Sequence, residues 1–268
     1  MSKLNKGSNI INFIFNIQSY FADFCEKHSK VLDVVFTLLF AVTYTYNFFL
    51  TTMFQEIMSD SVMAVLFNLS RLCTLGGVVF AIIAIASTRD RRKLFIEGII
   101  FLFLILFYVK GSYHEVFTVL IFALAAGNRS GRKLIWTTAI IGTFGMVASH
   151  RASMMGIIRY LTYANDTKHA FGITYHTDAA AHILNLMLAY CFLKPKKGDF
   201  WLTIDFIVIG FGLFINYRYI GARANLVMMI ILLAGTMLFD IVRDLNLEKI
   251  NPLVRVNHVF HTILGSAL

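Results

Sequence analysis

Hydrophobic stretches long enough to cross a lipid bilayer make up most of this sequence. A membrane-spanning helix needs about 20 mostly apolar residues, and the chain contains about eight such stretches. They cover residues 31–50, 61–87, 94–110, 115–127, 134–150, 178–193, 200–217 and 222–241. Inside a bilayer such stretches must be helical, because open sheet edges leave backbone groups unpaired. The sequence therefore predicts an all-α polytopic membrane protein, with one membrane domain filling residues 1–268.

The composition excludes the soluble enzyme folds. Hydrophobic residues make up 58% of the 268 residues and charged residues only 15%, against ~25% charged residues in an ordinary soluble domain. The mean hydropathy is +0.71, and a soluble domain of this length has too little interior for so many apolar side chains. The net charge of +9 does not indicate a nucleic-acid partner, because Lys and Arg orient membrane spans. Cys25, Cys73 and Cys191 are too far apart in sequence to suggest a metal site or a disulfide framework.

Apolar residues also recur at helical spacing ahead of the first span. They are Ile10, Phe13, Ile14, Ile17, Phe21 and Phe24, and Asn, Gln and Asp fill positions between them. This pattern predicts an interfacial amphipathic helix over residues 8–26, lying on the membrane as an anchor. The polar residues break residues 10–24 too often for the apolar region of a signal peptide, so no cleavable signal peptide is expected.

Basic residues gather in every second connection between the spans. They are Arg89, Arg91, Arg92 and Lys93, then Arg129, Arg132 and Lys133, and then Lys194, Lys196 and Lys197. Further basic residues precede the first span and follow the last one. Because positively charged connections stay in the cytoplasm, both termini and the tail 242–268 are predicted to be cytoplasmic.

The remaining cations are concentrated on the opposite, outer side. An intramembrane arginine costs at least a few kcal/mol, so it usually faces a polar cavity or a partner. A group of outer cations favours an anionic ligand that offsets the positive charge. The group comprises Arg151, Arg159 and Lys168 in the outer connection 151–177, Arg218 and Arg223 around the turn after the seventh span, and Arg71 in the outer half of the second span.

Titratable groups accumulate at the end of this long outer connection. His169, His176 and Asp178 are candidates for a general base, and Asp178 stands one helical turn before His182. An alternative is that Thr177 or Asp178 is the N-cap of the sixth span. No His-x-x-x-His or Cys-x-x-Cys pattern accompanies the histidines, so a metal site is not expected.

Two segments carry a resemblance to a known family. The stretch Lys168-His-Ala-Phe-Gly-Ile-Thr-Tyr-His-Thr-Asp178 resembles the signature basic-x-Ser-Phe-Gly-Phe-x-x-Pro-Asn/Thr-Asp of bacterial polysaccharide polymerases and O-antigen ligases. Tyr219-Ile-Gly-Ala-Arg223-Ala-Asn225 stands where that family carries a Thr-x-Ser-Arg-Thr type motif. The resemblance covers roughly residues 150–241 and is nearest to capsule-type repeat-unit polymerases. The sequence departs from the family where Lys168 replaces Arg, Ala170 replaces Ser and His176 replaces Pro.

The resemblance implies a substrate and a location. The substrate is an oligosaccharide on undecaprenyl pyrophosphate, presented at the outer face of the bacterial cytoplasmic membrane, and other partners are membrane lipids and polysaccharide-assembly proteins. The outer cations would bind the pyrophosphate and stabilise it as it leaves, so that no metal or other cofactor is expected. His176, His169 or Asp178 would accept the proton of the acceptor hydroxyl, in an inverting glycosyl transfer. Tyr175, Tyr217 and Tyr219 would stack on sugar rings, although tyrosine is also common at membrane interfaces.

Other functions remain open at this point. The ligase branch of the family transfers finished glycan to an acceptor, and a transporter of lipid-linked sugars performs no chemistry. Because family members are longer, the chain is expected to be a shortened or C-terminally truncated relative, one that needs a partner, or an inactive remnant.

Overall fold

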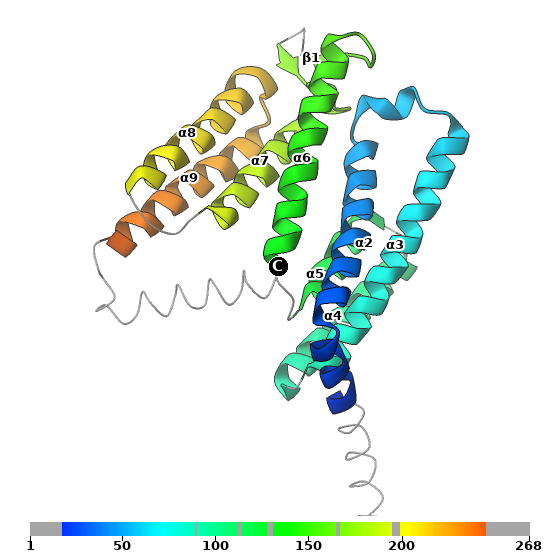
Figure 1. Ribbon diagram of the computed structural model, residues 1–268. Helices are drawn as coiled ribbons and strands as arrows, with labels where there is room; N and C mark the ends of the chain where they lie inside the picture. Colours follow the sequence, from blue (N-terminus) through cyan, green and yellow to red (C-terminus); the bar gives the residue numbers. More distant parts are fainter. Residues whose placement is uncertain are drawn as a thin grey trace, which may run out of the picture. The chain divides into compact units, whose positions relative to one another are not determined.

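The computed structural model describes residues 18–88, 90–111, 114–127, 131–164, 167–194 and 199–244. Their helices in chain order are α2 (Ser29–Leu50), α3 (Asp60–Ser87), α4 (Arg91–Val109), α5 (His114–Ala126), α6 (Gly131–Met154), α7 (His176–Leu193), α8 (Asp199–Ile215) and α9 (Arg223–Asp244), shown in Figure 1. Each falls on one predicted hydrophobic stretch, which confirms an all-α fold with helices at these positions. Residues 18–27 are also helical, whereas residues 8–17 of the predicted interfacial helix and most of the predicted tail lie outside the described residues.

Two of the described helices, α2 and α3, are long and apolar enough to cross a membrane. The core helix of a soluble protein or a signal sequence passes the same test, so this finding alone is weak evidence for a membrane protein. The chain also divides into two compact units. Among the described residues, unit 1 contains those within 18–43 and 69–131, and unit 2 contains those within 44–68 and 132–244. The single membrane domain stays a prediction.

The core of unit 1 is built from aromatic rings. Phe36 on α2 packs against Phe80 on α3 and Phe122 on α5, with ring centroids 5.3 Å and 5.7 Å apart. Gly77 on α3 lets Phe122 approach closely, because a Cβ at residue 77 would lie 3.1 Å from that ring. Both ring pairs are tilted, at 48° and 40° between planes, and contact between the rings adds to the free energy gained by burying them.

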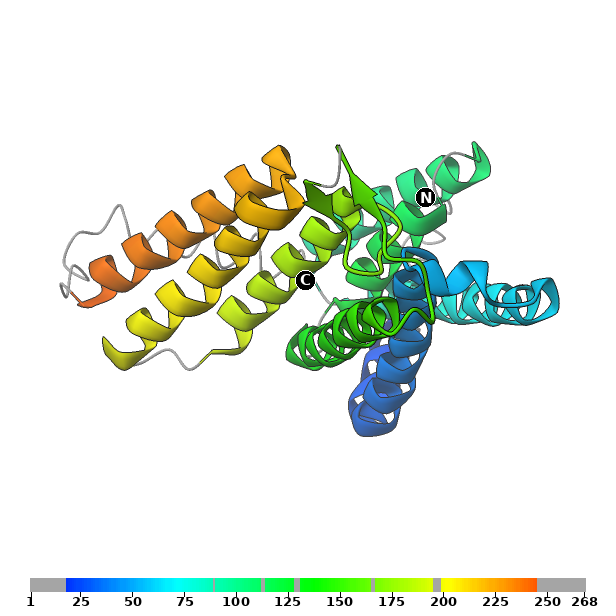
Figure 2. The same ribbon diagram turned by 90° about the horizontal axis from the view of Figure 1, so that it is seen from above.

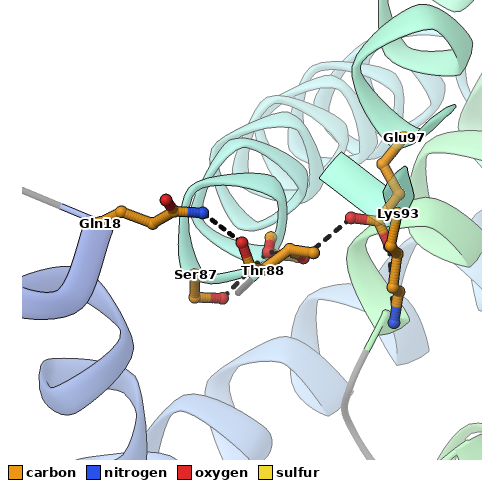
Figure 3. A network of polar contacts seen from close by, with 6 residues as sticks. Gln18, Ser87, Thr88, Lys93 and Glu97 are labelled. Carbon is orange, nitrogen blue, oxygen red and sulfur yellow. Dashed lines mark hydrogen bonds and ion pairs between the residues drawn. The ribbon is translucent and has the colours of Figure 1, made fainter. Parts of the chain in front are cut away.

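A polar network joins three helices of unit 1 where α3 ends. The hydroxyl of Thr88 donates to Glu97 on α4, with 2.9 Å between the oxygens, and the amide of Gln18 donates to the Thr88 carbonyl (Figure 3). Lys93 lies 3.7 Å from the Glu97 carboxylate, one turn earlier on α4. Glu97 is only 9% exposed, so these contacts offset the cost of burying its charge.

Helices α7, α8 and α9 pack against one another in unit 2 (Figure 2). Met187 on α7, Ile209 on α8 and Met229 on α9 form one core cluster. At the end of α7, Lys194 makes an ion pair with Asp205 on α8. The Tyr190 hydroxyl donates to the same carboxylate across 2.9 Å. Asp205 is completely buried, so both contacts fix α7 against α8.

The structure adds two features that hydrophobicity did not predict. Helix α6 continues to Met154, and the connection to α7 then forms a two-stranded hairpin, β1 (Thr162–Tyr163) paired antiparallel with β2 (Lys168–His169). Helix α8 passes directly into a π-helical turn, η2 (Asn216–Ile220), which ends at Gly221. A hairpin of two-residue strands and a single π turn are too short to produce a repeating pattern of apolar residues, so the sequence pattern could not predict them.

Candidate functional site

The segment that resembles the family signature begins on the hairpin. Tyr163 pairs with Lys168, and Thr162 pairs with His169. The tight reversal uses a left-handed backbone at Ala164, with φ of 52°. The hairpin thereby sets the direction in which the Lys168 and His169 side chains leave the backbone.

The next part of the segment requires a glycine. Gly172 has φ of +81°, and a Cβ there would lie 2.3 Å from the carbonyl oxygen of Ser149 on α6. The Met53 amide donates to the Gly172 carbonyl across 3.0 Å, and the Thr174 amide donates to the Thr51 carbonyl across 2.7 Å. The segment is therefore fixed between α6 and the short 3₁₀ helix η1 (Met53–Glu56) that follows α2.

The second family-like segment meets the first at Gly221. A Cβ at Gly221 would lie 3.1 Å from Cε of Lys168, so the aliphatic part of Lys168 lies across the backbone of residue 221. The side-chain amide of Asn225 on α9 donates to the Thr177 carbonyl on α7 across 3.0 Å. The two segments, about forty residues apart in sequence, thus form one continuous group.

His176 belongs to the first of these segments and is the first residue of α7. Burial lowers the pKa of its imidazole below the usual 6.5, and the positive charge of Lys168 lowers it further, against the opposing effect of Asp178. The ring of Tyr163 lies 5.1 Å from the imidazole, and the Tyr163 hydroxyl donates to the Thr174 carbonyl. A neutral imidazole at neutral pH is able to accept a proton.

An aromatic cluster flanks this group. The ring of His169 lies 6.0 Å from Tyr219 on η2 and 6.3 Å from Phe171. His169 Nδ1 is 3.0 Å from the Tyr160 hydroxyl. The guanidinium of Arg218 lies 5.8 Å from the centre of the Tyr219 ring, within the range of a cation–π contact.

The other predicted cations are distributed differently. Arg159 lies 3.7 Å from the Glu56 carboxylate, and the two side chains are 72% and 45% exposed. Arg151 is exposed in the last turn of α6, where it complements the helix dipole. Arg223 is exposed at the start of α9. Arg71 is an exposed residue of α3 in unit 1, whereas the other predicted site residues belong to unit 2.

The N-cap interpretation of Thr177 or Asp178 is wrong, because α7 begins earlier. Its N-cap is Tyr175, whose side chain makes no capping hydrogen bond. Asp178 instead lies in the first turn, where a negative charge stabilises the positive end of the helix dipole. Of the three tyrosines predicted to stack on sugars, Tyr175 and Tyr217 are exposed, at 58% and 75% of their surface. The ring of Tyr219 contacts the rings of His169 and Phe171.

Sequence reasoning missed the polar residues that hold the site together. Asn216 is completely buried on η2. The sequence signal that could have identified it is a single amide side chain within a predicted hydrophobic stretch. Thr51 Oγ1 contacts His182 Nε2 at 2.7 Å, and Glu56 pairs with Arg159. These long-range pairs left no signal in the spacing of residues. Among the described residues, no group of three His, Cys, Asp or Glu side chains is arranged to hold a metal ion.

The chain matches no protein-family model, no curated protein and no solved structure.

Proposed function

We propose that this protein polymerises lipid-linked oligosaccharides in the bacterial cytoplasmic membrane. It joins repeat units carried on undecaprenyl pyrophosphate, at the outer face. The observation that carries the proposal is the contact between the two family-like segments, made by Lys168 over Gly221 and by Asn225 on Thr177. The two segments are about forty residues apart in sequence, and one shared site requires them to meet.

Exposed apolar side chains support a membrane location. On α3, Val65 and Leu72 are each 66% exposed, and on α4 Phe95, Leu102 and Phe103 are 64–70% exposed. Soluble monomers rarely expose contiguous apolar patches of more than a few hundred Å². Lipid chains would cover these residues at no cost in free energy, and the backbone groups beneath them are already paired within the helices.

The cations around η2 suit a pyrophosphate. Lys168, Arg218 and Arg223 come from β2, η2 and the start of α9. Guanidinium groups bind phosphate oxygens through paired, charge-assisted hydrogen bonds. When the bond between the anomeric carbon and the pyrophosphate oxygen breaks, the electron pair stays on that oxygen. Fixed cations stabilise this developing charge more in the transition state than in the bound substrate.

His176 is the proposed general base of this reaction. It takes the proton from the acceptor sugar hydroxyl as the hydroxyl oxygen forms its bond to the anomeric carbon. Attack from the side opposite the leaving pyrophosphate inverts the anomeric configuration. His169 and Asp178 are the alternative bases, and Tyr175, Tyr217 and Tyr219 are the proposed surfaces for sugar stacking. Other polysaccharide-assembly proteins are the proposed partners.

Single substitutions of two cations test the proposal in cells. We expect Lys168→Ala and Arg223→Ala to abolish elongation of the surface polysaccharide while the protein remains in the membrane. Arg132→Ala is the matched control, because Arg132 is exposed in the first turn of α6. Glycan length is read on a gel and protein level by immunoblot. Full-length polymer from both site variants would contradict the proposal.

The same experiment distinguishes the related functions by product size. Loss of a polymerase leaves single repeat units, whereas loss of a ligase leaves long chains that are not attached to an acceptor. A transporter is recognised in vesicles, where lipid-linked sugar crosses the membrane and no glycosidic bond forms. Single units in the two site variants support the polymerase.

A further inference from the structure

A fully hydrogen-bonded amide is buried where α8 gives way to η2. Asn216 has no exposed surface. Its Oδ1 accepts from the Ala222 amide at 3.0 Å, and its Nδ2 donates to the Ala222 carbonyl at 3.2 Å. Nδ2 also lies 3.7 Å from the sulfur of Met229 on α9. Burying an amide costs several kcal/mol unless it is hydrogen-bonded, and here both of its polar atoms have partners.

These contacts close a loop that contains Arg218 and ends next to Arg223. The backbone carbonyl of Asn216 accepts from the Gly221 amide at 2.6 Å, which completes the π turn. Its side chain holds both backbone groups of Ala222, the residue before α9. Arg218 lies inside the closed loop, and Arg223 is the first residue after it. Single π turns are often found at functional sites.

We propose that Asn216 is a positioning residue that holds Arg218 and Arg223 at the separation required by a pyrophosphate group. This inference rests on the proposed function. Two cations held at a fixed separation engage both phosphates of a pyrophosphate, whereas a monophosphate engages one of them. Asn216 touches no substrate, so it acts through the two arginines. If Asn216 only stabilised the turn, its loss would reduce folding without changing the preference between the two ligands.

The preference for pyrophosphate over monophosphate is the decisive measurement. The full chain in detergent is titrated by calorimetry with farnesyl pyrophosphate and with farnesyl monophosphate. A reduced folded fraction lowers the number of binding sites for both ligands equally, so it leaves the ratio of their dissociation constants unchanged. We expect Asn216→Ala to lower the preference for pyrophosphate by about tenfold. This is the change in affinity expected when one charge-assisted hydrogen bond between an arginine and a phosphate is lost.

Tyr190→Phe is the matched control. It removes one hydrogen bond, to buried Asp205, between α7 and α8, and we expect it to leave the preference unchanged. A wild-type preference that Asn216→Ala does not alter overturns the inference and leaves the proposed function standing. A wild-type chain with no preference for pyrophosphate overturns both.

Amide hydrogen exchange of the wild-type chain provides a second test if Asn216→Ala does not fold. We expect the Gly221 and Ala222 amides to be protected, because both are bonded to Asn216. Farnesyl pyrophosphate should slow their exchange further, and farnesyl monophosphate should not. Exchange at the rate of an open loop, or an equal response to both ligands, overturns the inference.

Discussion

At the scale of single residues, the site depends on backbone positions that only glycine tolerates. We predict that Gly172→Ala destabilises the protein by roughly 3 kcal/mol or more, because it combines a left-handed backbone with a collision. The collision is with the Ser149 carbonyl oxygen, 2.3 Å from the new Cβ. The control is Gly156→Ala, since Gly156 has φ of +73° and nothing within 4 Å. It should cost about 1–2 kcal/mol, from the backbone alone.

Thermal unfolding of both glycine variants in detergent measures this difference. Equal losses of stability would show that the Ser149 contact relaxes at little cost.

The titration of His176 gives a prediction at the same scale. Its lowered pKa means that the folded chain resists protonation, while the unfolded chain takes up a proton below about 6.5. Stability from this group is therefore complete above pH 6.5 and is lost as the pH falls through the lowered folded pKa. Elongation should fall over the same acidic range, because the proposed base becomes protonated.

Nuclear magnetic resonance of the His176 ring tests the cause of this shift. We expect Lys168→Gln to raise the pKa of His176, because a positive charge that opposes protonation is removed. Arg132→Gln, a change at the first turn of α6, should leave it unchanged. Identical titration curves for Lys168→Gln and the wild type would contradict the assigned role of Lys168.

Only part of the candidate site is predictable from the sequence at this scale. Lys168, His176 and Arg223 are predictable because they lie in segments with a recognisable pattern, and Lys168 lies close enough to His176 for its charge to lower the His176 pKa. Asn216 and Glu56 are not predictable in this way, because each contacts a partner that is distant or irregularly spaced in sequence. The pairing of Arg159 with Glu56 across about a hundred residues was equally hidden.

At the scale of elements, the buried ion pair between α7 and α8 provides a test of packing. We predict that Lys194→Met destabilises the protein by about 3 kcal/mol, because it leaves the carboxylate of Asp205 buried without its counter-ion. Asp205 is completely buried and the Lys194 side chain is 11% exposed. The double variant Lys194→Met with Asp205→Leu should recover most of the loss, since apolar residues pack well in place of a buried pair.

Denaturant unfolding of the single and double variants measures this recovery. Arg159→Met, which breaks the exposed pair with Glu56, is the comparison and should cost less than about 1 kcal/mol. A double variant as unstable as Lys194→Met would contradict this account.

Helix positions were predictable at this scale, whereas helix ends were not. The length of the apolar stretches was enough to predict where α2 to α9 lie along the chain. The predicted sixth span began at residue 178, but α7 starts at His176. The prediction ended the fifth span at residue 150, but α6 runs to Met154, with Ala152 and Ser153 buried against neighbouring residues. Polar residues at a helix end do not reveal whether the helix has stopped.

At the scale of the whole molecule, the arrangement of charges predicts which face is outside. We predict that Met155→Cys is labelled by a membrane-impermeant maleimide in intact cells, because Met155 follows α6 on the expected outer side and is 73% exposed. Arg92→Cys should be labelled only after permeabilisation, because Arg92 belongs to a basic connection. Both variants are made in a chain whose Cys25, Cys73 and Cys191 are replaced by serine. Labelling of Arg92→Cys in intact cells would reverse the proposed orientation.

The pairing of residues 51–53 with residues 172–174 has a consequence for biosynthesis. The Thr51 carbonyl and the Met53 amide find their partners about 120 residues later. A ribosome adds about 5–20 residues per second. Residues 51–53 are therefore synthesised several seconds or more before residues 172–174. The end of α2 is therefore synthesised before its hydrogen-bond partner exists. During this interval a chaperone that binds nascent chains could contact the Thr51 carbonyl and the Met53 amide, which are still without their partners.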